Sequence, residues 1–108
     1  MELVDVHRSD ACHVPPCACY SRLVDLALVV DCSGQNLTVA PAELPEQGNN
    51  TKLLLPGNML SALPDFTLPG YQRVTELDLS HNHLSTLQGM DAMPKSIKVW
   101  ISPRAQIR

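Results

Sequence analysis

The sequence predicts a solenoid in which short β-strands and loops stack coil upon coil, with a disulfide-bonded cap at the N-terminal end. Two observations carry this prediction. The phrase L-x-L-x-x-N-x-L occurs at residues 53–60 and again at 77–84, so that Asn58 and Asn82 are 24 residues apart (82 − 58). Four cysteines precede these repeats. A fixed period in the twenties is typical of stacked repeat units, whose extended surfaces serve recognition.

The repeated phrase defines one short strand and one turn in each coil. Successive side chains of a strand point to opposite faces, so alternate leucines are expected to face the core. These inward residues are Leu53, Leu55, Leu77 and Leu79. A buried amide can satisfy backbone N–H and C=O groups in the turn, and we expect Asn58 and Asn82 to form a ladder between coils. The pattern indicates a leucine-rich-repeat solenoid of the α/β class, here rich in strands and loops, with a short parallel sheet on its concave face.

The segment before the repeats continues the same register. The run Leu26–Cys32 is β-rich and ends at Ser33-Gly34, and residues 18–24 are expected to pair with it as an antiparallel strand. Gln35 takes the asparagine place in this first coil. Val30, Cys32, Leu37 and Ala40 correspond to Leu53, Leu55, Leu60 and Leu63. Aromatic residues make up only 4% of the chain, which predicts an aliphatic core.

The cysteines are expected to form two disulfides. Four cysteines allow three pairings, and the short spacing of Cys17 and Cys19 argues against a bond between them, which leaves two patterns open for Cys12, Cys17, Cys19 and Cys32. Each bond stabilises a small domain by about 2–4 kcal/mol. The alternative is a zinc site that adds His7 and His13. Zinc sites usually present two closely spaced ligand pairs, whereas Cys32 stands alone, so we expect no metal and no other cofactor.

The chain divides into four segments by these patterns. Residues 1–11 show no period and are expected to be a tail or the end of an upstream segment. Residues 12–49 form the cap and first coil, residues 50–95 two repeats, and residues 96–108 a degenerate or truncated repeat. In the last segment either Val99 and Ile101 take the strand-leucine places, or Ile97, Trp100 and Ile107 face inward. We expect this end, which has no predicted cap, to favour self-association.

Several features indicate an extracellular location. The sequons Asn36-Leu37-Thr38 and Asn49-Asn50-Thr51 make Asn36 and Asn49 candidate glycosylation sites. The N-terminus lacks the apolar segment of a signal peptide, so a mature product or an excised fragment is expected.

No apolar run is long enough to cross a membrane. The net charge is −3, which gives no reason to expect a nucleic-acid partner.

The outward side chains of the predicted sheet form the candidate recognition surface. They include Lys52, Leu54, Glu76, Asp78, Ser80 and His81. Asp78, Ser80 and His81 also suggest a hydrolytic triad, but a triad needs side chains that converge in space, whereas these are outward alternates of the strand leucines and turn residues. The sequence therefore predicts protein recognition and no enzymatic activity.

The cysteine cluster and the repeats together resemble a known family. The residues are C-x4-C-x-C-x12-C from Cys12 to Cys32, then V-D-C-S-G at residues 30–34, Leu44-Pro45, and the phrase at residues 53–60. They resemble the N-terminal cap and first repeats of extracellular leucine-rich-repeat proteins. Cys17-Ala18-Cys19-Tyr20, followed by the long insertion to residue 29, is similar to the membrane-proximal cap of invertebrate Toll receptors.

This resemblance implies a disulfide pattern and a function. First-to-third and second-to-fourth pairing gives Cys12–Cys19 and Cys17–Cys32. The implied protein is the ectodomain of an innate-immune or developmental signalling receptor, with a secreted cystine-knot cytokine as ligand or with receptor self-association. The alternative is a secreted matrix or adhesion protein of the same architecture without a signalling role.

Overall fold

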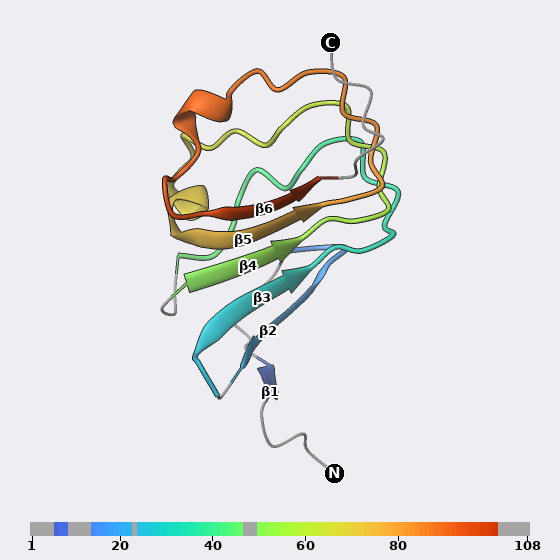
Figure 1. Ribbon diagram of the computed structural model, residues 1–108. Helices are drawn as coiled ribbons and strands as arrows, with labels where there is room; N and C mark the ends of the chain where they lie inside the picture. Colours follow the sequence, from blue (N-terminus) through green and yellow to red (C-terminus); the bar gives the residue numbers. More distant parts are fainter. Residues whose placement is uncertain (1–5, 9–13, 23, 47–49, 102–108) are drawn as a thin grey trace.

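The computed structural model describes residues 6–8, 14–22, 24–46 and 50–101. These residues form one six-stranded sheet with the strands in sequence order. The strands are β1 (Val6–Arg8), β2 (Ala18–Arg22), β3 (Ala27–Asp31), β4 (Asn50–Leu54), β5 (Val74–Leu79) and β6 (Lys98–Ile101). Two short 3₁₀ helices, η1 (Pro69–Arg73) and η2 (Met90–Ala92), lie in the return segments. Figure 1 shows the return segments arching over one face of the sheet, so that each coil consists of a strand and its loop.

Strands β3 to β6 are parallel, as the predicted solenoid requires. Val30 pairs with Leu53, Leu53 with Leu77, and Leu77 with Val99. The equivalent leucine places of successive coils therefore stand side by side, which confirms the predicted parallel sheet of a leucine-rich-repeat solenoid. The register of β6 places Val99 and Ile101 in the strand-leucine places, which decides between the two alternatives for the last segment.

The N-terminal end of the sheet is antiparallel. β2 and β3 form a hairpin in which Cys19 pairs with Val30, and residues 18–22 give the expected partner strand. At the tip of the hairpin, Arg22 forms an ion pair with Asp25 at 2.6 Å. The hydrogen bond from Arg22, followed by one from the Ala27 N–H, lowers the pKa of the Asp25 carboxyl.

Residues 6–8, within the segment expected to be a tail or the end of an upstream segment, form a short strand. They form β1, which pairs antiparallel with β2 through Val6 and Arg22, His7 and Ser21, and Arg8 and Tyr20. Three residues are too few to show a period-2 pattern, because a strand is recognised in sequence by alternation over four or more residues. The strand is formed by pairing with the edge of β2, which the sequence of residues 6–8 does not predict.

The core lies between the sheet and the return segments. Its fully buried members from the repeats are Leu53, Leu55, Leu60, Leu77, Leu79 and Leu84. The first coil contributes Leu28, Val30 and Cys32, and Leu37, Ala40 and Leu63 pack against the cluster while partly buried. The predicted inward leucines are thus found where the alternation places them.

Two aromatic residues also belong to this core, which the expectation of an aliphatic interior missed. Phe66 and Tyr71 are buried and pack edge to face, with ring centroids 6.0 Å apart. The Tyr71 hydroxyl donates a hydrogen bond of 2.6 Å to the Pro41 carbonyl, and burial raises the pKa of this phenol. Both rings come from the return segment after β4, where no repeat phrase marks inward positions. A low aromatic content therefore does not mean that the aromatic residues present lie outside the core.

The residue before the asparagine place adopts a left-handed backbone in the coils of β3, β4 and β5. Gly34 has φ of 60°, Gly57 of 69° and His81 of 56°. Glycine meets this requirement without a Cβ penalty, whereas His81 carries the strain that an L-residue has there. A Cβ on Gly57 would meet nothing closer than 3.9 Å, so only the backbone conformation opposes a side chain.

Gly57→Ala is therefore expected to lower the free energy of unfolding by about 1–2 kcal/mol. Gly57→Asn is expected to cost less, because asparagine tolerates the left-handed region better than alanine. Urea denaturation followed by circular dichroism measures both variants. An alanine variant as stable as the parent chain would show that this turn does not require a left-handed residue.

Candidate functional site: the outer face of the parallel sheet

The candidate site is the face of β3–β6 that points away from the core, which we call the concave face. Two cross-strand rows of side chains cover it. The first row runs Val29, Lys52, Glu76, Lys98, and the second runs Asp31, Leu54, Asp78, Trp100. Figure 1 shows the four strands side by side, so that each row crosses all of them. Because strands hold their side chains rigidly, the rows form a preorganised surface.

The first row is largely neutralised within itself. Lys52 Nζ forms an ion pair and hydrogen bond with Glu76 Oε2 across β4 and β5. The Lys52 side chain is only 15% exposed and the Glu76 side chain 32%, so this pair is better shielded from water than a free surface ion pair. Val29 is buried at the start of the row, and Lys98 is exposed at its other end. The row leaves Lys98 as its accessible charge.

The second row alternates acid and apolar side chains. Leu54 lies between Asp31 and Asp78, and Trp100 lies beside Asp78 on β6. Trp100 is 47% exposed and is the large aromatic of this face. Asp31 and Asp78 each accept a hydrogen bond from the backbone N–H two residues on, at 3.0 Å from Ser33 and 2.9 Å from Ser80. These bonds orient the carboxylates at the ends of their strands.

Ser80 and His81, which the sequence assigns to the same surface, belong to the turn after β5. The Ser80 carbonyl accepts hydrogen bonds from Gly57 N and from Asn82 Nδ2, and Ser80 is partly buried. His81 is exposed in its left-handed conformation. The structure thus brings together Lys52, Leu54, Glu76 and Asp78 on the strands and sets Ser80 and His81 at their edge.

Sequence reasoning missed Lys98 and Trp100 as members of the concave face. Their coil lacks the asparagine of the repeat phrase, so its register stayed open between two alternatives. The signal that could have found them is the pair Val99 and Ile101. If these two take the inward places, alternation sends Lys98 and Trp100 outward.

The asparagine places connect each coil to the one before it. Asn58 is 3% exposed, and its Oδ1 accepts hydrogen bonds from Gln35 N at 2.9 Å and Leu37 N at 3.0 Å. Its Nδ2 donates to the carbonyls of Cys32 at 2.9 Å and Leu55 at 3.1 Å.

Asn82 repeats this arrangement one coil later. Its Oδ1 accepts from Leu60 N at 3.0 Å, and its Nδ2 donates to the carbonyls of Leu55 at 2.8 Å and Leu79 at 3.2 Å. Each amide therefore joins the backbones of two coils and does not bond to the other asparagine. This bonding holds the turns at one edge of the concave face in register.

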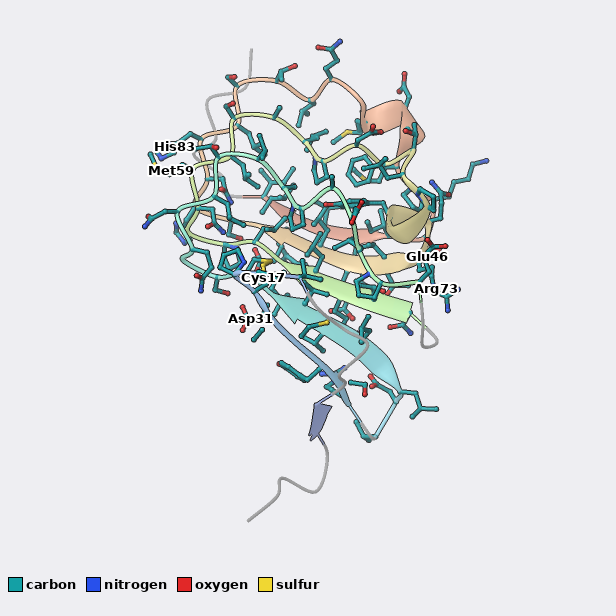
Figure 2. All side chains as sticks on the ribbon, turned by 180° about the vertical axis from the view of Figure 1, so that it is seen from behind. Cys17, Asp31, Glu46, Met59, Arg73 and His83 are labelled. Carbon is teal, nitrogen blue, oxygen red and sulfur yellow. A yellow bond between two sulfur atoms is a disulfide. The ribbon has the colours of Figure 1, made fainter. Side chains whose placement is uncertain are left out.

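A disulfide closes the N-terminal end of the stack. Cys17 is bonded to Cys32, which is fully buried in the core, and the bond is visible near the Cys17 label in Figure 2. Cys19 is also disulfide-bonded. Cys12 lies outside the described residues, so the Cys12–Cys19 pairing stays a prediction. Because Cys17 and Cys32 are oxidised, they are not available as the thiolate ligands of the zinc alternative.

The two sequons differ in their surroundings. Asn36 and Thr38 are exposed in the segment that follows β3. Asn49 lies outside the described residues, whereas Thr51 of the same sequon is fully buried in β4. Thr51 pairs with Leu28 on one side and Val74 on the other.

The side chains of the hydrolytic alternative do not form a relay through the contacts that the structure shows. Asp78 Oδ1 accepts its hydrogen bond from the backbone of Ser80, and the neighbouring His81 is exposed at the turn. A triad needs its base between the nucleophile and the carboxylate. In the described ranges, no group of three or more histidine, cysteine or acidic side chains has the arrangement of a metal site.

Comparisons with known proteins agree with this architecture. No family model matches the chain. Protein toll of Drosophila melanogaster is 38% identical over 84 residues, which cover 75% of this chain and 8% of that protein. Human leucine-rich repeat-containing protein 3 is 35% identical over 82 residues, or 76% of this chain and 30% of the relative. These similarities and the Cys17–Cys32 disulfide indicate an extracellular protein of leucine-rich-repeat architecture.

Solved structures of Toll have a fold similar to that of this chain. Two structures of the Drosophila Toll–Spätzle complex contain a similar fold. One has a TM-score of 0.64 and 36% identity over 75% of this chain and 11% of the matched chain. The glycosylated form has a TM-score of 0.71 and 34% identity over 85% of this chain and 12% of the matched chain. The chain thus resembles part of a Toll ectodomain.

The chain spans less than a third of the length of the curated relatives it matches. In the part of the chain that the structure describes, no helix has the length and apolar character to cross a membrane.

Proposed function

We propose that this chain is a protein-recognition module of a Toll-like signalling receptor, and that it binds a protein partner through the concave face. The partner is a secreted protein ligand of the cystine-knot type or a second receptor ectodomain. The proposal is supported by the similarity to Toll, whose solved complex contains the protein Spätzle. It assigns no catalytic step to the chain.

The observation that carries the proposal is the row Asp31, Leu54, Asp78 and Trp100. Neighbouring strands lie about 4.8 Å apart, so this row extends over about 14 Å of rigid surface. Tryptophan is enriched among the residues that dominate binding energy at interfaces, especially where surrounding groups exclude water. Trp100 is about half exposed in this row and has a carboxylate beside it. Burial of its ring by a partner would remove that apolar surface from water.

The charges of the face indicate what kind of partner surface fits. Lys52 and Glu76 neutralise each other, so they offer little net attraction. Asp31 and Asp78 flank Leu54, which makes the second row acidic with apolar members. The complementary surface therefore carries an apolar side chain opposite Leu54 or Trp100 and basic groups opposite the aspartates.

The proposal is tested with the secreted, disulfide-bonded chain. Its binding to Spätzle is measured by surface plasmon resonance, and its self-association by sedimentation velocity. The variants are Trp100→Ala and Leu54→Ser on the concave face, and the matched control is Val39→Ser, because Val39 is 73% exposed in the segment between β3 and β4. We expect each concave variant to weaken the contact about tenfold or more.

Two outcomes would contradict the proposal. One is that the parent chain neither binds the ligand nor self-associates at micromolar concentration. The other is that the concave variants behave like the parent chain while Val39→Ser weakens the contact, which would move the contact to another face.

A further inference from the structure

The turn that follows β3 in the first coil carries an exposed sequon at one edge of the solenoid. Asn36 and Thr38 are exposed, while Leu37 between them packs against the core. Asn36 has a left-handed backbone with φ of 59°, a conformation in which asparagine is favoured over most residues. The exposed hydroxyl residue two positions later, Thr38, completes the N-x-T acceptor sequence for glycosylation.

Asn36 has equivalents in the next two coils, and together they form a row that we call the turn edge. In each coil the member of this row follows the asparagine place, which gives Asn36, Met59 and His83. Backbone hydrogen bonds fix the stacking, because Met59 N donates to the Leu37 carbonyl at 2.7 Å and His83 N to the Leu60 carbonyl at 2.9 Å. Figure 2 shows Met59 and His83 at the same edge of the molecule.

Met59 is the apolar member of the turn edge. The residue is 51% exposed, although the neighbouring Asn58 and Leu60 are buried. Adjacent coils of the stack lie about 4.8 Å apart, so the root of a glycan on Asn36 is about one sugar ring away from Met59. The apolar face of an N-acetylglucosamine ring is chemically complementary to an exposed apolar side chain such as that of Met59.

We propose that Asn36 carries an N-linked glycan whose first N-acetylglucosamine packs over Met59. In the transfer, Asn36 Nδ2 attacks the anomeric carbon of an oligosaccharide held on a lipid diphosphate. A C–N bond forms, the C–O bond to the diphosphate breaks, and the diphosphate leaves with the electron pair while the amide loses one proton. The extracellular location supplies the secretory route on which this donor is met. The concave face, which lies on the outer side of the strands, remains free.

The experiment uses the chain secreted from cells that make high-mannose glycans. All variants carry Asn49→Gln, so that the second sequon contributes nothing. Thr38→Ala removes the acceptor but keeps Asn36, and Thr38→Ser keeps the acceptor. We expect one glycan by intact mass in the parent and Thr38→Ser chains, released by peptide N-glycosidase, and none in Thr38→Ala. Absence of a glycan on the Asn36 peptide would overturn the proposal.

The packing over Met59 is tested by oxidation. Endoglycosidase H trims the glycan to a single sugar, and hydrogen peroxide then converts exposed methionines to sulfoxides. Met59 in the one-sugar chain is expected to oxidise roughly threefold more slowly than in Thr38→Ala, because oxidation follows exposure. Met90, which is 37% exposed in η2, is the internal reference and should react equally in both. Equal Met59 rates would show that the sugar does not cover this side chain.

This test is independent of the proposed ligand contact. A chain that binds no protein ligand can still carry the glycan, and an unglycosylated chain can still bind through Trp100.

Discussion

Replacing Asn58 with alanine is expected to lower the free energy of unfolding by about 3–5 kcal/mol, since each buried backbone group left without a partner costs about 1–3 kcal/mol. Asn58 satisfies two N–H groups of the first coil, at Gln35 and Leu37, and two carbonyls, at Cys32 and Leu55. Its side chain is nearly inaccessible, so water cannot replace these bonds without opening the turn. A small domain of ordinary stability would lose a large part of its total by this one change.

Chemical denaturation of the disulfide-bonded chain, followed by circular dichroism, measures this loss. Gln35→Ala is the matched control, because Gln35 occupies the same place in the first coil but is exposed, with a single side-chain bond of 3.3 Å to the Ser33 carbonyl. It is expected to change stability by less than about 0.5 kcal/mol. If Asn58→Ala were as stable as Gln35→Ala, the amide bonds between coils would not support the stack.

The second large effect is expected from the cap disulfide. Removing the Cys17–Cys32 bond with the double substitution Cys17→Ala and Cys32→Ala should cost about 3 kcal/mol, the loop-closure value for a loop of about 15 residues. The bond joins residues 15 apart in sequence. Alanine is chosen because Cys32 is fully buried and serine would place a hydroxyl in the core. For a domain of this size, we expect the melting temperature to fall by about 10–20 °C.

Scanning calorimetry of the variant and the parent chain gives this difference directly. Treatment of the parent with a phosphine reductant should lower its melting temperature at least as much, because reduction also opens the disulfide of Cys19. A double-alanine variant that melts with the parent would mean that hydrophobic packing alone holds the cap strand on the stack.

The repeat phrase predicted most of the fold because each of its positions has a physical role. Inward leucines such as Leu53 and Leu77 must alternate along a strand, and Asn58 must be buried at a turn with unpaired backbone groups. These requirements recur in every coil, so two copies of the phrase define the parallel sheet and its register. The first coil was found in the same way from Val30 and Cys32, even though glutamine replaces the asparagine there.

Other parts of the structure depend on neighbours that a local pattern does not show. β1 exists because β2 offers an open edge, and its three residues carry no alternation of their own. Phe66 and Tyr71 are buried by the irregular return segment, in which no fixed spacing separates inward from outward side chains. Trp100 was left ambiguous because its coil has no asparagine to set the register.

The candidate site was accordingly predicted in part. Lys52, Leu54, Glu76 and Asp78 follow from alternation on strands with a clear register. The ion pair between Lys52 and Glu76 needs knowledge of cross-strand pairing, and the register of β4 against β5 shifts between Thr51 and Lys52. The row from Asp31 to Trp100 crosses four strands, so it can be recognised only once the pairing of all four strands is known.

The central claim is that this chain is an extracellular solenoid with a disulfide-bonded cap, and cystine mapping tests it most directly. The chain purified without reduction is alkylated, digested and analysed by mass spectrometry. We predict no free thiol, a linked peptide pair for Cys17 and Cys32, and a second pair for Cys12 and Cys19. Alkylated Cys17 and Cys32, or four free thiols that hold a metal ion in native buffer, would contradict the cap and the extracellular assignment with it.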